Sequence, residues 1–311
     1  MRARALGILA GYLADRAWGD PQRWHPVAGF GQVAHRLEQR MWTDDRSRGI
    51  AYSAALVGGT GLIGRALEQT TRRSPVAQFA LTAAATWAVL GGRSLEREAE
   101  AVRDRLDLID LEPAREQLTH LVGRNTTHLD APDIARAVIE SVAENTSDAV
   151  VAPLTAGALF GLPGLLAYRA ANTLDAMVGH RNERYTNFGW ASARLDDLLN
   201  WLPARLGAAL AVLLAPAVGG TPENALATWR RDASSHPSPN AGQIEAAFAG
   251  ALGVRLGGLN EYGGVTEDRH MLGDGPAPLP TDIERATTLG RLVGHVSAAL
   301  AVLVSLLRRA G

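Results

Sequence analysis

Long stretches without a charged residue alternate along the chain with strongly polar segments. Residues 74–92 and 149–168 are uncharged over about the 20 residues that a membrane-spanning helix needs. Residues 49–64, 206–222 and 292–307 are uncharged over slightly shorter lengths. A surface helix of a water-soluble protein seldom lacks charge for so long, because one of its faces meets water. The pattern predicts an all-α, polytopic integral membrane protein with long polar helical loops.

This pattern predicts a single membrane-embedded domain over residues 1–311. Its apolar segments are expected near residues 5–14, 49–64, 74–92, 149–168, 206–222 and 286–307. The alternative is a water-soluble protein with a large alanine-rich core, which extraction from membranes without detergent would support.

Glycine motifs within the apolar segments favour close packing of helices. Gly7 and Gly11 form a G-x-x-x-G face on the first, short segment. Residues 59–64 match G-x-G-x-x-G, the pattern of dinucleotide-binding sites. That function needs a preceding strand and an acidic residue about 20 positions later. Because the motif lies inside an apolar run and lacks that acid, we interpret it as a helix-packing surface.

Composition narrows the possible chemistry. The net charge of −1 gives no electrostatic reason to expect a nucleic acid as partner. All 31 basic residues are arginine and there is no cysteine, which excludes a Schiff-base lysine, a Walker-A lysine and a thiolate nucleophile. Catalysis in this chain must therefore use carboxylates, histidine, arginine, hydroxyl groups or a bound metal.

Acidic residues gather at the end of the polar segment 93–148. Glu140 and Glu144 are four positions apart and share one face of a helix, with Asn145 and Asp148 next to them. Two like charges so placed repel each other, whereas a divalent cation would reverse the sign of the interaction. The alternative is an ordinary solvated acidic face.

The polar segment 169–205 is dense in asparagine, aspartate and arginine. Such groups beside apolar helices cost desolvation energy unless they are paired or hold a ligand. Guanidinium groups are suited to clamping phosphate or carboxylate. The alternative is a salt-bridged helical hairpin. The candidates in this segment are Asn172, Asp175, His180, Arg181, Arg184, Arg194, Asp196 and Asp197.

A compact polar loop follows the first apolar segment. It contains Asp20 and His25, and Pro21 and Pro26 stiffen it. A functional role and an interfacial loop anchored by tryptophan are equally consistent with this loop. Two further loops, near His236 and Asn260, carry no mechanism by themselves.

These motifs resemble the adenosylcobinamide-phosphate synthase family of cobalamin biosynthesis, known as CbiB or CobD. The resemblance lies mainly in ESVAENTSDAVVAPL and in YRAANTLDAMVGHRNERYTNFGWASARLDDLLNWLPARL, and it extends over nearly the whole chain. Two positions depart from the family pattern. Asn125 stands where the family often has Asp, and Ala149 stands where it often has Gly, so a role for an acid at position 125 is in doubt.

The resemblance implies an ATP- and Mg²⁺-dependent ligase. Such an enzyme joins the free propionate of adenosylcobyric acid to (R)-1-aminopropan-2-ol or its O-phosphate. On this basis the hypothesis assigns catalysis to Glu140, Glu144, Asp148, Asp175 and His180. It assigns substrate or phosphate binding to Asn145, Asn172, Arg181, Arg184, Arg194, Asp20 and His25. It assigns the metal to Glu144, Asp148, Asp175, Asp196 and Asp197.

Membrane topology constrains this hypothesis, because Asp148 and Asn172 flank the apolar run 149–168. If that run spanned the bilayer, the two motifs would face opposite compartments. The run contains two prolines and three glycines, so we expect a break near residues 161–164 and a re-entrant course. The expected location is the cell (inner) membrane, in contact with lipid and with the active site facing the cytoplasm. Homo-oligomers remain open, as does a transporter or a corrinoid-binding sensor without catalysis.

Overall fold

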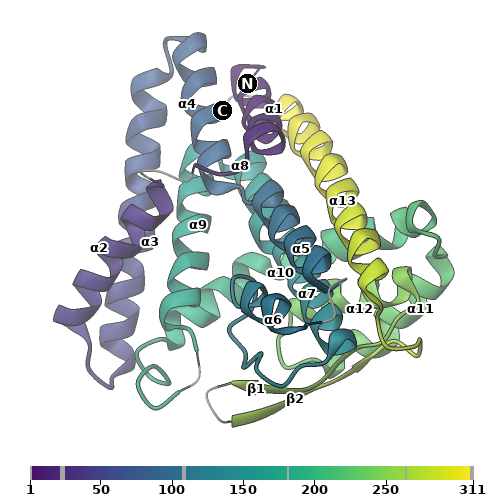
Figure 1. Ribbon diagram of the computed structural model, residues 1–311. Coiled ribbons are helices and arrows are strands. Elements are labelled where there is room, and N and C mark those ends of the chain that lie inside the picture. The colour runs from purple at the N-terminus through teal and green to yellow at the C-terminus, as the bar shows by residue number, and fades with distance from the viewer. Residues whose placement is uncertain (1, 22–24, 107–109, 181, 263–264, 309–311) are drawn as a thin grey trace. The chain divides into compact units, whose positions relative to one another are not determined.

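The computed structural model describes residues 2–21, 25–106, 110–180, 182–262 and 265–308. The fold is mainly helical, as the sequence predicts (Figure 1). The α-helices are α1 (Arg2–Trp18), α2 (Pro26–Met41), α3 (Arg46–Thr71), α4 (Pro75–Val89), α5 (Gly92–Leu106), α6 (Glu112–Leu118), α7 (Ala131–Thr146), α8 (Ala152–Phe160), α9 (Leu162–Val178), α10 (Trp190–Leu214), α11 (Pro222–Asp232), α12 (Ala241–Leu252) and α13 (Pro280–Leu307).

The chain folds into two compact units. The first unit contains Met1–Gly91, Ala152–Asn200 and Ser297–Gly311, and the second contains Gly92–Val151 and Trp201–Val296. Helices α10 and α13 each contribute residues to both units. The prediction of one membrane-embedded domain stays open.

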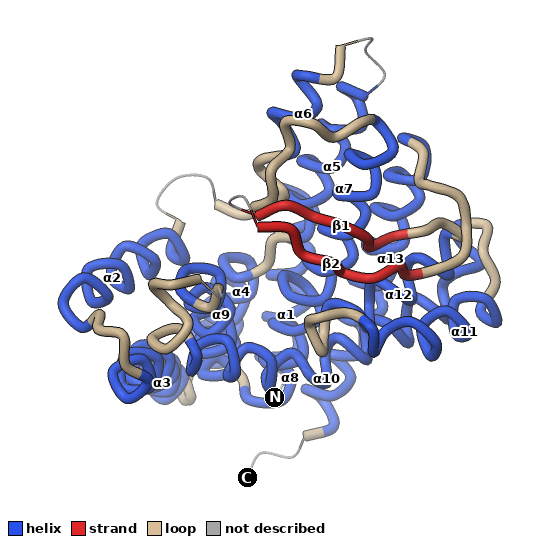
Figure 2. Tube along the Cα trace, turned by 90° about the horizontal axis from the view of Figure 1, so that it is seen from below, coloured by secondary structure: helices blue, strands red, loops and turns tan. Residues whose placement is uncertain are grey.

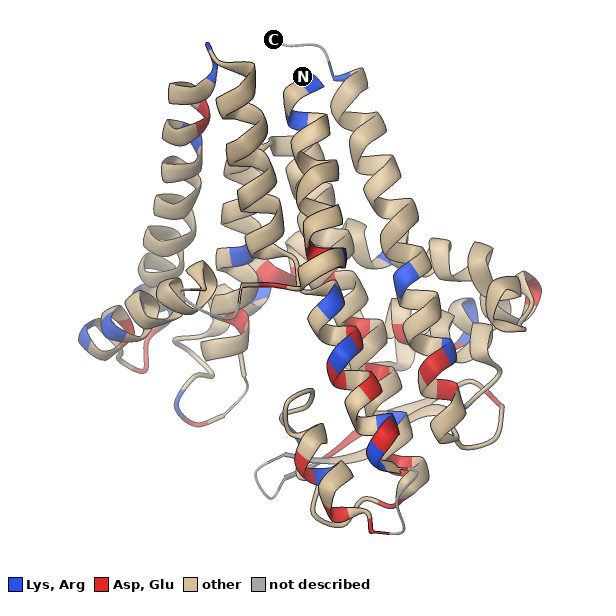
Figure 3. Ribbon diagram, turned by 45° about the horizontal axis from the view of Figure 1, so that its top comes forward, with Lys and Arg blue, Asp and Glu red and all other residues tan. Residues whose placement is uncertain are grey.

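Among the described residues, three helical segments are long and apolar enough to cross a membrane: Arg46–Thr71, Trp190–Val218 and Pro280–Leu307. Figure 3 shows that charged residues lie toward the ends of α3, and the sequence has none between residues 48 and 65. These segments overlap the predicted runs 49–64, 206–222 and 286–307. The finding fits the predicted membrane protein. Spanning by residues 5–14, 74–92 and 149–168 stays a prediction.

Glycine packing is confirmed at Gly11 and Gly64, but not at Gly59, where nothing lies within 4 Å of an added Cβ atom. Helix α1 lies against α4, and a Cβ atom added at Gly11 would lie 2.5 Å from the carbonyl oxygen of Ala83. One added at Gly64 would lie 2.8 Å from the Cα atom of Pro163, where α3 packs on α9. Because the backbones approach so closely, only glycine fits at both positions.

The predicted break in the run 149–168 is present. A π-helical turn, Ser147–Val151, leads into α8, which ends at Phe160, and α9 begins at Leu162. Gly161 between them has φ +70°, a conformation that glycine adopts without strain. The nine residues of α8 extend over only about 14 Å, less than half of a bilayer core. Re-entry into the membrane stays a prediction.

The second unit contains a β-hairpin that the sequence analysis missed. Strand β1 (Leu256–Tyr262) pairs antiparallel with β2 (Val265–Leu272), and the register is irregular between Gly257 and Leu259 (Figure 2). Both strands contact α12, and β1 also contacts α7. The dipeptide Gly263-Gly264 between two short strand-like runs was the available sequence signal. The hairpin brings Asn260 next to α7.

Candidate functional site

Helix α7 positions the acidic motif of the second unit. Its N-cap residue, Asp130, accepts a hydrogen bond from the backbone N–H of Asp133 at 2.9 Å, and a proline occupies its first turn. The apolar positions of α7 are buried, and Glu140 lies among them with 3% of its surface exposed. The alternative of a solvated acidic face is therefore wrong for Glu140.

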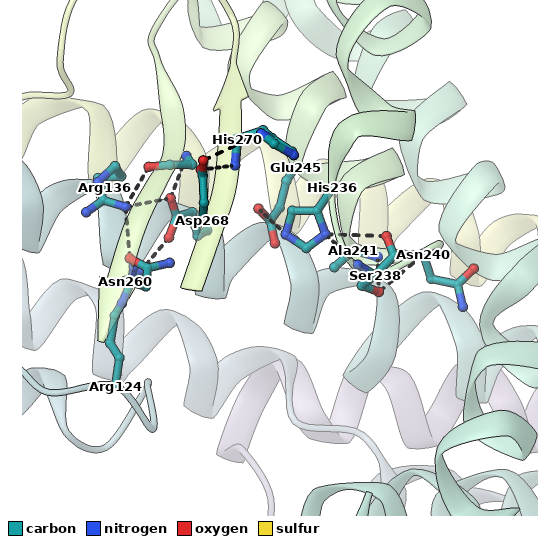
Figure 4. Close-up of polar contacts among 12 residues, drawn as sticks. Arg124, Arg136, His236, Ser238, Asn240, Ala241, Glu245, Asn260, Asp268 and His270 are labelled. Atoms are coloured by element: carbon teal, nitrogen blue, oxygen red, sulfur yellow. Dashed lines mark hydrogen bonds and ion pairs between the residues drawn. The ribbon is translucent and has the colours of Figure 1, made fainter. Parts of the chain in front are cut away.

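Glu140 is the centre of a buried polar cluster. The guanidinium of Arg124 donates to Glu140 Oε2 at 2.6 Å, and that of Arg136 donates to Oε1 at 3.3 Å. The backbone N–H of Gly257 donates to Oε1 at 2.8 Å. Both arginines also donate to the side-chain oxygen of Asn260 (Figure 4). Burial raises the pKa of Glu140, but the two guanidinium groups and the Gly257 N–H outweigh it, so the carboxylate is held ionised.

Two further acids in this cluster have raised pKa values. Burial raises the pKa of Glu144, and the negative charge of Glu140 adds to this effect, while Arg269 opposes it. Burial also raises the pKa of the fully buried Glu245 well above its usual range, together with the charges of Glu140 and Glu144. The pKa of Glu140 is therefore lowered, whereas those of its neighbours Glu144 and Glu245 are raised.

Glu245 faces His236 (Figure 4). His236 Nε2 lies 3.7 Å from Glu245 Oε2, and neither Glu245 oxygen has a hydrogen-bond partner among the described residues. His236 Nδ1 accepts a hydrogen bond from the backbone N–H of Ser238 at 3.0 Å, so the proton of a neutral ring sits on Nε2 and points to the acid. Burial lowers the pKa of His236 to about 4. We call this set the glutamate cluster: Arg124, Arg136, Glu140, Glu144, His236, Glu245, Asn260 and Arg269.

The other predicted residues of the motif lie at the end of α7. The amide of Asn145 donates to the carbonyl oxygen of Ser141, one turn back, at 2.9 Å. Asp148 lies in the π-helical turn and is partly exposed. Such turns within helices occur frequently at functional sites.

The first unit holds a second polar group, which we call the aspartate network: Tyr168, Asn172, Asp175, Asp196 and Asn200. The buried carboxylate of Asp196 on α10 accepts from the amide of Asn200 at 2.8 Å. It also accepts from the amide of Asn172 on α9 at 3.4 Å. Tyr168 donates its hydroxyl proton to Asn200 at 2.8 Å. The structure thus brings together the predicted residues Asn172 and Asp196, which are 24 positions apart in sequence.

Asp175 belongs to the same network. Its charge acts directly on Asp196. A Cβ atom at Gly179 would lie 1.9 Å from Asp175 Oδ1, so glycine is required beside this carboxylate. Among the described residues, no three His, Asp or Glu side chains gather as a metal cage. Two adjacent carboxylates nevertheless fit Mg²⁺, which often takes one or two protein carboxylates and completes its shell with substrate phosphate and water.

The predicted arginines and His180 differ in their exposure and in their hydrogen-bond partners. Arg184 donates to the buried carboxylate of Glu38 at 2.9 Å and stacks on Trp42 at 4.8 Å, so its guanidinium already has partners. Arg194 donates to Asp197 at 3.3 Å, and both side chains are accessible. His180 is exposed and contacts the carbonyl oxygen of Ala176 at 2.9 Å. Arg181 lies outside the described residues.

The polar loop after α1 has one defined pair. His25 caps α2, because its Nδ1 accepts from the backbone N–H of Val27 at 3.1 Å. Its Nε2 lies 3.2 Å from Asp20 Oδ2. The structure therefore brings these two predicted residues together.

The predicted site residues fall in both units. Glu140, Glu144, Asn145 and Asp148 belong to the second unit, and the others to the first. The sequence analysis missed Arg124, Arg136 and Glu245, and it gave no mechanism to His236 or Asn260. Arg136 and Glu140 are four positions apart on α7, which was a usable signal for an ion pair.

Comparison with known proteins identifies the family of this chain. A sequence profile of the family described as CobD/Cbib protein matches residues 8–290. The chain belongs to the CobD/Cbib family. No solved structure matches the chain.

Three relatives are similar to this CobD/Cbib chain over most of their length. The chain is 51% identical to a protein of Mycobacterium tuberculosis over 99% of its own length and 98% of the relative's. It is 43% identical to one from Chromobacterium violaceum over 97% of each chain, and 42% identical to one from Rhodobacter capsulatus over 86% and 85%. All three are named cobalamin biosynthesis protein CobD.

The polar side chains of the two clusters are of the kinds that bind anionic substrates and exchange protons. Guanidinium groups and ionised carboxylates stabilise developing charge, and protonated acids exchange protons. The chain offers neither lysine nor cysteine as a covalent nucleophile. The groups left for a biosynthetic role are therefore carboxylates, histidine, arginine, hydroxyl groups or a bound metal.

Proposed function

We propose that the protein is an acid–amine ligase of cobalamin biosynthesis. Its substrates would be ATP, adenosylcobyric acid and (R)-1-aminopropan-2-ol or its O-phosphate. The product would be the amide, adenosylcobinamide or its phosphate. Membership of the CobD/Cbib family and the names of the relatives support the pathway and a corrinoid substrate.

The observation that carries the reaction type is the protonation pattern of the glutamate cluster. Two arginines lower the pKa of Glu140, while burial raises the pKa values of Glu144 and Glu245. Acids with separated pKa values in one site are the usual basis for acid–base chemistry. Joining an amine to an acid requires removal of an ammonium proton and a second proton as the nitrogen acylates, so proton acceptors are needed.

The chemistry follows from the weakness of a carboxylate as an electrophile. A propionate oxygen attacks the γ-phosphorus of ATP, the bond to ADP breaks, and an acyl phosphate forms. The amine then attacks the acyl carbon, and inorganic phosphate leaves with the electrons of the broken C–O bond. The amine proton passes to a carboxylate or to His180. No covalent bond to the protein is needed, in keeping with a chain without lysine or cysteine.

The side chains would divide the work as follows. Asp175 and Asp196 would hold Mg²⁺ jointly with the phosphates, and Asp197, Glu144 and Asp148 are further candidates. When bound, Mg²⁺ would neutralise charge on the transferring phosphoryl group. Arg194 would add a guanidinium to the phosphates, and Asn172 keeps Asp196 oriented through its amide. Arg184, already paired with Glu38, would contribute by holding its loop.

We also propose that the active site faces the cytoplasm from the cell membrane. ATP is available on that side, and the short helix α8 with the break at Gly161 supports a re-entrant course. Cysteine accessibility in the naturally cysteine-free chain tests this directly. His128→Cys and Ala176→Cys, at exposed positions before and after the run 149–168, should both react with a membrane-impermeant maleimide from the same side. Labelling from opposite sides would contradict the re-entrant course.

The experiment that tests the function is a defined reconstitution. Purified protein in detergent receives adenosylcobyric acid, ATP, Mg²⁺ and either amine, and the product is followed by mass. We expect an amide product that requires ATP. Glu144→Ala and Asp175→Ala should abolish it while the protein remains in the membrane fraction. Near-normal turnover in either variant would contradict its assigned role.

A second candidate function is transport or binding of a corrinoid without catalysis. The observation in its favour is the helix break at Gly161 beside apolar helices, because transporters form substrate sites at discontinuous helices. An assay with proteoliposomes loaded with adenosylcobyric acid distinguishes the transporter from the ligase. Substrate movement without ATP-dependent amide formation would favour the transporter.

A further inference from the structure

Helix α3 is the least covered of the three described segments that are long and apolar enough to cross a membrane. Only 22% of its apolar stretch is buried, compared with 50% for Trp190–Val218 and 44% for Pro280–Leu307. Leu62 and Ile63 are 68% and 59% exposed, and a Cβ atom added at Gly58 would meet nothing within 4 Å. Exposed apolar surface of this kind marks contact with a partner or with a membrane.

The exposed apolar surface continues across the turn onto α4. Helix α4 contacts α3 and has no charged residue along its whole length. Leu67 is exposed near the end of α3, and Val76 and Phe79 are exposed in the first turns of α4. The two helices therefore present large apolar side chains on both sides of the turn that joins them.

Arginine residues surround the same turn. Arg65, Arg72 and Arg73 are exposed, and in the part of the chain that the structure describes their side chains have no hydrogen-bond or ion-pair partner. Arg2 at the start of α1 is also exposed. The ion pair of Arg4 with Glu68 brings the start of α1 to this end of α3.

Acidic residues hardly offset this positive charge. Glu68 is the only acidic residue between Asp45 and Glu96, and Arg4 already neutralises it. Figure 3 shows charged segments at the ends of α3 and none along α4. We call this surface the α3–α4 end. It comprises Arg2, Leu62, Ile63, Arg65, Leu67, Arg72, Arg73, Val76 and Phe79.

The opposite end of α3 has a different charge balance. Residues 36–48 contain four arginines and three acidic residues, whereas residues 65–73 contain three arginines and one acidic residue. Arg36 and Arg40 on α2 are exposed, but Asp44 and Asp45 follow them closely. The two groups of arginines are separated by α3, which has 26 residues and is about 39 Å long. The excess of positive charge thus belongs to the α3–α4 end.

We propose that the α3–α4 end binds an anionic phospholipid. The phosphate of the headgroup binds Arg72 and Arg73, since guanidinium groups match phosphate oxygens in charge and geometry. The acyl chains pack on the exposed apolar side chains of α3 and α4. This inference requires a membrane location for the protein, but it does not depend on the ligase activity.

Other ligands match only part of this surface. A soluble phosphate ester would use the arginines, but it would leave the apolar side chains uncovered. A zwitterionic lipid such as phosphatidylcholine would cover the apolar side chains, but it would gain little from the excess positive charge. An anionic lipid uses both, and arginines next to a membrane surface attract such lipids.

The test counts the lipids that remain bound to the full-length protein. The protein is placed in nanodiscs with equal amounts of phosphatidylglycerol and phosphatidylcholine that carry the same acyl chains, and native mass spectrometry counts the retained lipids. We expect about a tenfold enrichment of phosphatidylglycerol, because each arginine near an anionic membrane surface accounts for about a fivefold effect. Equal retention of the two lipids would overturn the proposal. Displacement of phosphatidylglycerol by glycerol 3-phosphate would also overturn it, because it would identify a site for soluble anions.

Variants locate the site. Arg72→Gln combined with Arg73→Gln should remove most of the enrichment, and Arg72→Lys combined with Arg73→Lys, which keeps the charge, should retain it. The matched control is Arg36→Gln combined with Arg40→Gln, which removes the same charge at the opposite end of α3 and should leave the enrichment unchanged. The unfolding temperature in phosphatidylcholine alone shows that each variant folds as the wild type does. Unchanged enrichment in the Arg72/Arg73 glutamine variant, or an equal loss in the control, would contradict the proposed location.

Discussion

In the second unit, the buried carboxylate of Glu140 is balanced by two guanidinium groups, whereas in the first unit Asp196 is bound by neutral amides. Among the described residues Asp196 has no cationic partner, and the nearby Asp175 adds a second negative charge. Two guanidinium groups thus contact Glu140 itself, whereas in the aspartate network the guanidinium of Arg169 contacts the amide oxygen of Asn172, at 3.4 Å. In the proposed function, the glutamate cluster provides fixed geometry and proton exchange, and the aspartate network holds Mg²⁺.

The largest expected effect comes from breaking the completed ion pair. Arg124→Met leaves Glu140 buried with one guanidinium fewer, which should lower the free energy of unfolding by about 3–5 kcal/mol. Thermal unfolding in detergent measures the loss. The matched control is Arg103→Met, whose exposed partner Asp104 makes the pair worth less than about 1 kcal/mol. Similar losses in both variants would contradict a special role for burial.

The second effect concerns pH in the glutamate cluster. In the folded chain the pKa of His236 is about 4, below its ordinary value of 6.5. Between pH 4 and pH 6.5 the His236 ring is therefore protonated in the unfolded chain but neutral in the folded chain. Stability due to His236 is complete above pH 6.5 and falls as the pH drops to 4, by up to about 3 kcal/mol. His236→Gln should lose this slope, as measured by unfolding at several pH values. An unchanged slope would contradict a buried neutral ring.

Glu245 should show the opposite sign. Its pKa is raised in the folded chain, so its contribution to stability is present below pH 4.5 and falls as the pH rises. Glu245→Gln resembles the protonated acid and should gain stability relative to the wild type above pH 4.5. The same titration series measures it, and a relative loss above pH 4.5 would indicate an ionised Glu245.

A smaller effect is expected in the aspartate network. Asn200→Leu removes the amide that donates to Asp196 and the acceptor of the Tyr168 hydroxyl, which should cost about 1 kcal/mol. Tyr168→Phe, which removes only the donor, should cost less.

Added Mg²⁺ with ATP should raise the unfolding temperature of the wild type. If it does so equally for Asp196→Asn, the network is not the cation site.

The smallest effect on stability is expected at the exposed pair Arg194–Asp197. Arg194→Met should change the free energy of unfolding by less than about 1 kcal/mol. If Arg194 contacts phosphate, the same variant should lower kcat/KM for ATP about tenfold or more. Normal kinetics would show that the pair is only a surface salt bridge.

The parts of the fold that follow from local sequence were predictable. Charge-free runs predicted the apolar helices, the spacing of Gly7 and Gly11 predicted a packing face without its partner, and glycine and proline predicted the break at Gly161. Each of these depends on the periodicity or backbone preferences of a few neighbouring residues. The β-hairpin was missed because its short strands resembled a glycine-rich loop.

The partners of the candidate side chains were less predictable. Arg184 was expected to bind phosphate, but it pairs with Glu38, which is 146 positions away in sequence. Arg136 reaches Asn260 across 124 positions through the hairpin. No periodicity encodes such contacts, because they arise only when separate elements pack. The sequence therefore predicted which residues carry chemistry better than what each one touches.

The central claim is that the propionate is activated by phosphorylation and then captured by the amine. Adenosylcobyric acid labelled with ¹⁸O in its free carboxylate tests it most directly, with wild-type protein, ATP, Mg²⁺ and the O-phosphate of 1-aminopropan-2-ol. The account predicts that, for each amide formed, one ¹⁸O atom from the carboxylate appears in the released inorganic phosphate, as measured by mass spectrometry. Amide formation with ¹⁸O in AMP, or with unlabelled phosphate, would contradict it, as would the absence of any amide.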